Sequence, residues 1–186
     1  MTNATATQHI VNGVNVTELS KTIAAVGEAP KIAEFKFRLE NKWNNGGANR
    51  SHIAGFYGAC EEIERDRGFI LDADEPEILL GRDSGANPVE FVLHALAACM
   101  TTGIVYHAAA RGIVIEELSS KLEGDLNLKG FLGLDNENPR GYSEIRVKFT
   151  VKTDAPESEL HELYQFSPVY DMVKRSLPVK VEFDYV

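Results

Sequence analysis

Cysteine is scarce in this chain, whose 186 residues contain only two. Two cysteines are too few for the disulfide framework of a small secreted domain, or for an all-cysteine zinc site. The five histidines do not form the short paired spacing of metal ligands either, so we expect neither a metal nor another cofactor. Each cysteine is therefore either a small apolar filler or a reactive thiol.

Basic residues are also in the minority, since 19 Lys and Arg face 28 Asp and Glu and leave a formal charge of −9. Phosphate backbones and anionic bilayers attract basic surfaces, so neither nucleic acid nor a membrane is expected as a partner. The first nine residues contain no Lys or Arg and lead into no apolar run, which predicts a cytoplasmic protein without a secretory signal. Hydrophobic content of 44% and charged content of 25% are typical of a soluble globule.

Residues 1–30 are predicted to form an appendage to a domain that spans residues 31–186. Within the appendage, Asn15 is a candidate cap for a short helix that ends at Gly27. From Lys31 the hydrophobic period changes to two, and the alternation over residues 33–40 predicts a strand. The turn-forming run 44–47 then predicts a hairpin with a second strand at 51–58.

The most informative segment is a long apolar helix. Asn87 suits its N-cap, Pro88 suits its first turn, and residues 91–110 are apolar or small almost throughout. A helix of about 24 residues spans roughly 36 Å. Because it is apolar on all sides, it is expected in the centre of a core or across a subunit interface.

After this helix the pattern predicts strands, a helical region and a final strand. Residues 113–127 and 145–151 read as extended, 156–165 and 169–176 as helical, and 179–185 as the last strand. Strands and helices that are segregated in this way predict an α+β fold with a mainly antiparallel sheet.

Cys99, in the middle of the long helix, is the candidate for chemistry. A buried cysteine in an Ala-rich helix is usually a filler, whereas a reactive thiol needs a nearby cation to lower its pKa. Arg50, Arg82 and Arg111 are candidate cations, and each is equally compatible with a merely solvated role. Cys60 lies in a charged segment and reads as an incidental thiol.

The run from Gly81 to Phe91, continued by Leu96 to Cys99 and Ala110 to Ile113, resembles the signature of OsmC-like proteins in the superfamily of osmotically induced and organic-hydroperoxide-resistance proteins. The resemblance covers about residues 31–186. It implies an intertwined α+β homodimer, with long central helices buried back to back and sites at the subunit interface. It also implies a thiol peroxidase, in which Cys99 attacks an organic hydroperoxide, a second cysteine captures the sulfenic acid, and external thiols reduce the disulfide.

Several positions depart from that family pattern. Ser167 begins a Ser-Pro-Val segment where the family has Cys-Pro-Val, and Val89 occupies the place of the family's Glu, with Glu90 one residue later. Arg82 and Arg50 are rival candidates for the family's Arg. With these departures, the resemblance implies a stress-response protein with a single-cysteine site at Cys99. This site would reduce organic hydroperoxides or react with other electrophiles, and a small thiol would take the place of the second cysteine. The expected pocket is drawn from Ser167, Glu90, Val89, Arg82 and Arg50.

Two alternatives remain open at this point. The chain could be a non-catalytic protein that binds a small apolar ligand in the same pocket, since Val89 and Ser167 both remove reactive groups. Alternatively, Cys60 could replace the missing second cysteine as a resolving thiol.

Overall fold

The computed structural model describes residues 8–186 and contains two compact units. The first unit combines Met1–Leu19 with Val92–Val186, and the second comprises Ser20–Phe91. Each unit is described by itself below.

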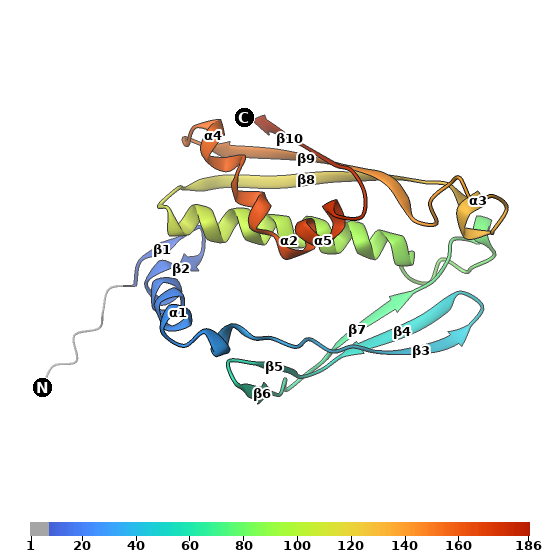
Figure 1. Cartoon of the computed structure of the whole chain (residues 1–186), viewed down its shortest axis with the longest axis horizontal. Helices are drawn as coiled ribbons and strands as arrows, with labels where there is room; N and C mark the ends of the chain where they lie inside the picture. Colours follow the sequence, from blue (N-terminus) through green and yellow to red (C-terminus); the bar gives the residue numbers. More distant parts are fainter. Residues whose placement is uncertain (1–7) are drawn as a thin grey trace, which may run out of the picture. The chain divides into compact units, whose positions relative to one another are not determined.

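The first unit is built on a three-stranded sheet with the order β10-β9-β8 (Figure 1). Strands β8 (Ile115–Leu126) and β9 (Tyr142–Thr153) form a long antiparallel hairpin, and β10 (Val179–Tyr185) pairs with β9 in parallel. The period of two predicted for β9 is confirmed, because its apolar side chains alternate onto one buried face. These side chains are Ile145, Val147, Phe149 and Val151, each at most 2% exposed.

The long helix α2 (Pro88–Ala110) begins where the sequence predicts. The Asn87 side-chain oxygen accepts from the backbone N–H of Val89 at 3.0 Å, and the Glu90 carboxylate accepts from the backbone N–H of Asn87 at 2.8 Å. This reciprocal pair satisfies two backbone donors that a helix N-terminus leaves free.

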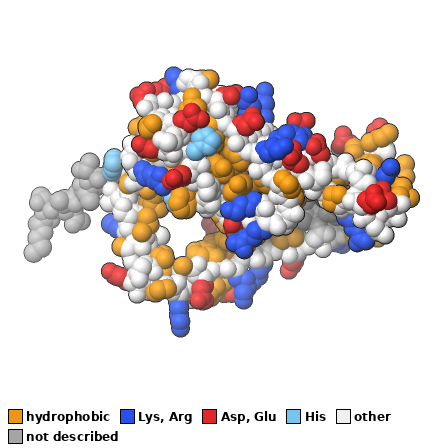
Figure 2. Space-filling view, turned by 45° about the horizontal axis from the view of Figure 1, so that its top comes forward, with side chains coloured by type: hydrophobic (Ala, Val, Ile, Leu, Met, Phe, Trp, Pro, Cys, Tyr) orange, Lys and Arg blue, Asp and Glu red, His pale blue; other side chains and the backbone are white. Residues whose placement is uncertain are grey.

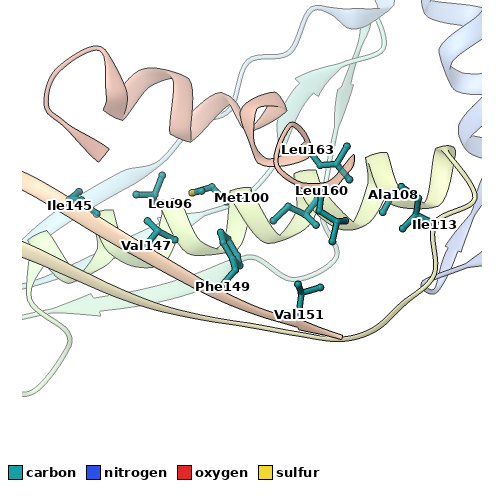
Figure 3. Close-up of a cluster of buried hydrophobic side chains, with 11 residues drawn as sticks. Leu96, Met100, Ala108, Ile113, Ile145, Val147, Phe149, Val151, Leu160 and Leu163 are labelled. Carbon is teal, nitrogen blue, oxygen red and sulfur yellow. The ribbon is translucent and has the colours of Figure 1, made fainter. Parts of the chain in front are cut away.

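One side of α2 packs on the sheet and forms the core of the first unit (Figure 3). Leu96, Met100 and Ile104, spaced by four residues, are fully buried against the apolar face of β9. Toward other sides of the helix, Val92 is 41% and Tyr106 48% exposed. The sequence predicts a helix that is buried on all sides, but within the single chain only the side that faces the sheet is buried.

By length and composition alone, α2 could cross a membrane, with a mean hydropathy of 1.5 over 18 residues. Core helices of soluble proteins meet the same criterion. Five of its 23 residues are buried, so one side of α2 belongs to the core of the first unit.

Three short helices lie between β9 and β10 in the sequence and pack against α2. They are α4 (Glu157–Leu160), η3 (Leu163–Phe166) and α5 (Pro168–Lys174), and Leu160 and Leu163 anchor them in the core. A further short helix, α3 (Leu128–Phe131), lies in the β8–β9 connection.

An N-terminal hairpin of β1 (Ile10–Val11) and β2 (Val14–Asn15) is tied to the end of α2. The Asn12 side chain donates to Ile113 O and accepts from Ile115 N, both at 2.9 Å. Helix α1 (Val16–Glu28) follows, and the predicted cap is present because the side-chain oxygen of Asn15 accepts from the backbone N–H of Glu18 at 3.1 Å.

The second unit contains two small antiparallel sheets. One has the order β3-β4-β7, formed by β3 (Glu40–Asn45), β4 (Ala48–Ile53) and β7 (Phe69–Ala73). The other pairs β5 (Phe56–Gly58) with β6 (Glu61–Ile63). The 3-10 turns η1 (Pro30–Ala33) and η2 (Glu77–Leu79) complete the unit, and the α+β class with a mainly antiparallel arrangement is confirmed.

The predicted strand over 33–40 is wrong, since the chain forms a strand only from Glu40 onward. Within 34–39 a single bridge, between Lys36 and Tyr57, pairs the backbone. Phe35 and Phe37 stack on each other and contact the ring of Phe56, but they remain 51% and 70% exposed. Alternation predicts which side chains share a face, but a strand also needs a neighbour to bond with.

Candidate thiol site on the long helix

Cys99 lies in the middle of α2, is half-buried and carries a free thiol. The next residue, Met100, points into the core, so the thiol lies on a neighbouring face of the helix rather than inside the sheet packing. A filler cysteine would be expected at a fully buried position, so this exposure leaves the thiol open to reagents.

Gly103 brings a second predicted site residue close to this thiol. A Cβ at Gly103 would lie 3.6 Å from Leu163 O, 3.7 Å from Ser167 N and 3.9 Å from Ser167 Cα. Residues four apart share one face of a helix and are separated by about 6 Å along its axis. The backbone at Ser167 therefore crosses α2 about one helical turn from Cys99.

Ser167 acts as the N-cap of α5 rather than as an exposed polar group. It is 1% exposed, and its hydroxyl oxygen accepts from the backbone N–H of Tyr170 at 3.1 Å. Its own backbone N–H donates to Tyr164 O at 3.0 Å. The hydroxyl thus stabilises the start of the helix that follows, a role for which Ser is among the favoured residues.

Aromatic rings line the segment around Ser167. Phe166 stacks on His107 of α2 with ring centroids 4.0 Å apart, and Tyr164 meets Tyr170 edge to face at 5.0 Å. Burial, and then the nearby Arg111, lower the pKa of His107. A neutral imidazole two helical turns from Cys99 serves as a packing surface and not as a base for that thiol.

Arg50, one of the predicted cations, belongs to the second unit and has a carboxylate partner there. Its Nε and Nη2 donate to the two carboxylate oxygens of Asp72 on β7, at 2.6 and 2.9 Å. This two-pronged hydrogen bond raises the pKa of Arg50 and lowers that of Asp72. Both side chains are solvent-accessible, at 58% and 42% exposed.

Arg82 lies in a loop of the second unit that is organised by Asp74, a residue the sequence analysis missed. The Asp74 carboxylate is 1% exposed and accepts from the backbone N–H groups of Glu75, Arg82 and Ser84 and from the Ser84 hydroxyl. These hydrogen bonds, that of the Ser84 hydroxyl first, lower the pKa of Asp74 despite its burial. No short motif marks this residue, because most of its partners are backbone groups up to ten residues away.

The predicted pocket residues Val89 and Glu90 stand at the start of α2. The Glu90 carboxylate is engaged in the capping pair with Asn87, and Val89 is half-buried. Glu90 and Cys99 are nine residues apart in one helix, which corresponds to about 13.5 Å along its axis. Within a single chain the two side chains are therefore not brought together.

Cys60 occupies the tip of the β5–β6 hairpin in the second unit. Ala59 and Cys60 form its two-residue turn, with φ values of 51° and 66°. Its thiol is exposed and free and lies beside the Tyr57 hydroxyl, where burial and then the Cys60 thiol raise the pKa of Tyr57. Among residues 8–186, no three His, Cys, Asp or Glu side chains gather in a way that could hold a metal ion.

Comparison with known proteins identifies the family. A family model for OsmC-like proteins matches residues 81–182, which include α2, Cys99 and Ser167. A search of curated proteins finds no match.

Solved structures share the fold at low sequence identity. An OsmC-like protein of Mycoplasma pneumoniae is 19% identical, with a TM-score of 0.62 over 81% of this chain and 97% of that one. An organic hydroperoxide resistance protein of Elizabethkingia anophelis is 15% identical, with a TM-score of 0.58 over 81% and 98%. An OsmC-like protein of Vibrio cholerae is 12% identical, with a TM-score of 0.56 over 81% and 99%. The family match spans more than half of the sequence and agrees with the fold, so the chain belongs to the OsmC-like protein family.

Proposed function

We propose that this protein reduces organic hydroperoxides at Cys99 and uses an external thiol in place of a second cysteine. The Cys99 thiolate attacks the O–O bond of ROOH, the alcohol ROH leaves after taking up a proton, and the cysteine becomes a sulfenic acid. A small thiol R′SH condenses with the sulfenic acid to a mixed disulfide and releases water. A second R′SH then restores the Cys99 thiol and leaves as R′SSR′.

The observation that carries the proposal is the pairing of Cys99 with Ser167. The free, half-buried thiol lies one helical turn from the point where the Ser167 backbone crosses α2. Ser167 offers a buried, capping hydroxyl that cannot form a disulfide, so resolution needs a thiol from solution. Family membership supports the peroxide chemistry, as does the name of the related Elizabethkingia anophelis protein.

The thiolate needs a cation, and we assign that role to Arg50 or Arg82. Arg50 is held in a fixed orientation by Asp72, and the backbone of Arg82 is fixed by Asp74. Val89 and Glu90 complete the proposed pocket at the start of α2. Charge reversal at the correct arginine should slow alkylation of Cys99 at neutral pH, whereas the same change at the other arginine should leave the rate unaltered.

The working form in this proposal is a cytoplasmic homodimer. Support comes from the exposed side of α2, which carries Val92 and Tyr106, and from the exposed Phe35 and Phe37 in the segment before β3. Apolar surface of this extent marks a subunit interface in soluble proteins. The cytoplasm supplies reduced thiols for turnover. Sedimentation at several protein concentrations tests the dimer.

A peroxidase assay with a matched control tests the activity. The wild type should consume cumene hydroperoxide in the presence of a monothiol and should react with a sulfenic-acid trap. Cys99→Ala should lose both signals, whereas Cys60→Ala, which removes an exposed thiol in the second unit, should keep them. A wild type without thiol-dependent consumption, or with a signal that survives Cys99→Ala, contradicts the proposal.

Two features of the chain favour alternative functions. The apolar Val89 and the buried Ser167 hydroxyl also suit a non-catalytic protein for a small apolar ligand, which slow and unselective alkylation of Cys99 would favour. The exposed Cys60 thiol could serve as a resolving group. Disulfide mapping after peroxide treatment decides this point, because a Cys60 that stays free ends that alternative.

A further inference from the structure

The connection between β8 and β9 carries an unusual concentration of exposed apolar side chains. Within residues 127–141, here called the hairpin tip, Phe131 is 71% exposed, Leu134 69%, Leu132 59% and Leu128 36%. The tip lies wholly in the first unit, at the end of a hairpin whose strands are 12 residues long. Hydrophobic side chains are visible over this end in Figure 2.

The tip is held together by polar groups and not by its apolar side chains. The Asn127 side chain caps α3 at Lys129 N and donates to Asn138 Oδ1 at 2.9 Å. The Asp135 carboxylate accepts from the backbone N–H groups of Glu137 and Asn138 and from the Asn138 side chain. The hydrogen-bonded polar groups are exposed or partly buried, and the apolar side chains of the tip are exposed beside them.

Close backbone packing reinforces this arrangement. Gly130 is buried, and a Cβ there would lie 2.4 Å from Pro139 O. The backbone N–H groups of Leu132 and Leu134 donate to Leu128 O and Lys129 O at 2.8 and 2.9 Å. The loop that carries the four apolar side chains is therefore already ordered, so binding to a partner would cost little further conformational entropy.

We propose that the hairpin tip inserts into the surface of an uncharged, zwitterionic lipid bilayer. Backbone groups that enter the apolar part of a bilayer need hydrogen-bond partners within the protein, and the backbone N–H groups of Leu132, Leu134 and Asn138 have them. The tip carries Lys129, Arg140, Asp135 and Glu137, which sum to no net charge. The expectation of no membrane partner rested on the charge of −9 of the whole chain, which opposes anionic lipids but does not act against this neutral tip.

A bilayer suits the patch better than a second protein surface does. Four side chains of at most about 200 Å² each, exposed to 36–71%, offer well under the roughly 800 Å² per partner of a stable protein interface. A projecting tip with few side chains matches instead the shallow insertion of peripheral membrane proteins. The inference does not depend on the thiol chemistry of Cys99.

The experiment uses the full chain and vesicles of pure phosphatidylcholine. Because Trp43 is the only tryptophan, Phe131→Trp in a Trp43→Phe background places one fluorophore in the tip. Its emission should shift to the blue when vesicles are added. In co-sedimentation, the double variant Phe131→Ser with Leu134→Ser should partition about tenfold less than the wild type. Both substituted side chains are exposed, so the fold should be retained.

The controls separate the possible occupants. Ile78→Ser, which removes an 88% exposed side chain from the second unit, should bind vesicles like the wild type, and so should Cys99→Ala. The absence of a blue shift, or equal binding by the double variant, overturns the proposal. A blue shift that follows protein concentration without vesicles also overturns it, because a second copy is then the occupant.

Discussion

Gly103 provides a sharp test of the contact between α2 and Ser167. A Cβ at this position would meet Leu163 O and Ser167 N at 3.6 and 3.7 Å, which is ordinary van der Waals contact. Alanine therefore fits without strain, and Gly is about 1 kcal/mol less favourable than Ala inside a helix. We expect Gly103→Ala to raise the free energy of unfolding by about 0.5–1 kcal/mol. For a chain of this size, that corresponds to an increase in Tm of about 1–4 °C.

The larger variant Gly103→Val is expected to have the opposite sign. Its γ carbons extend about 1.5 Å beyond the Cβ and enter the space of Leu163 and Ser167, so overpacking should lower the free energy of unfolding by about 1–3 kcal/mol. Urea unfolding at one fixed protein concentration measures both variants, provided that the m-value is unchanged. A destabilised Gly103→Ala would show that the segment at Leu163 and Ser167 lies closer to α2 than 3.6 Å allows, and a Gly103→Val as stable as the wild type would show that Ser167 does not pack on α2 here.

Three further predictions concern the framework of the two units. Ser167→Ala removes the cap on Tyr170 N and should lower the free energy of unfolding by about 0.5–2 kcal/mol in urea titrations, whereas Ser167→Thr should recover most of the loss. Phe149→Ala empties a fully buried position and should cost about 3–5 kcal/mol in the same measurement. Asp74 has a folded pKa below its unfolded value of about 3.9, so its stabilisation is present above about pH 4 and is lost as the pH falls toward the folded pKa. Asp74→Asn should therefore flatten the acid limb of the stability profile, and an unchanged limb would contradict the role assigned to this carboxylate.

The parts of the fold that rest on local chemistry could be predicted from the sequence. The start of α2 follows from Asn87, Pro88 and Glu90, which cap the helix through their own neighbours. The alternation in β9 likewise placed Phe149 and its companions on one face. The same reasoning wrongly predicted a strand over 34–39, because an alternating segment forms a strand only where a neighbouring strand pairs with it.

The candidate site divides in the same way. The sequence analysis identified both Cys99 and Ser167. It did not identify Gly103, because the importance of this helical glycine appears only when the segment at Leu163 and Ser167 packs against it. The sequence did not reveal Asp74 as a site, because most of its partners are backbone groups, which every residue has. The parallel pairing of β10 with β9 also depends on long-range packing that no local pattern encodes.

The residue at position 167 affects both the stability of α5 and the proposed reaction of Cys99. At the N-cap of α5, the side-chain oxygen of Ser167 accepts from the backbone N–H of Tyr170, and a thiol, as a weak acceptor, would satisfy this donor poorly. A serine at this position therefore makes a stronger helix cap than a cysteine would. A protein that regenerates its sulfenic acid with external thiols loses nothing by this exchange, whereas one that relies on an internal disulfide loses turnover. The variant Ser167→Cys separates the two cases. It should weaken the cap of α5 and, if its sulfur reaches Cys99, form a disulfide on treatment with peroxide. Turnover, which depends on a monothiol in the wild type, should then depend on a dithiol.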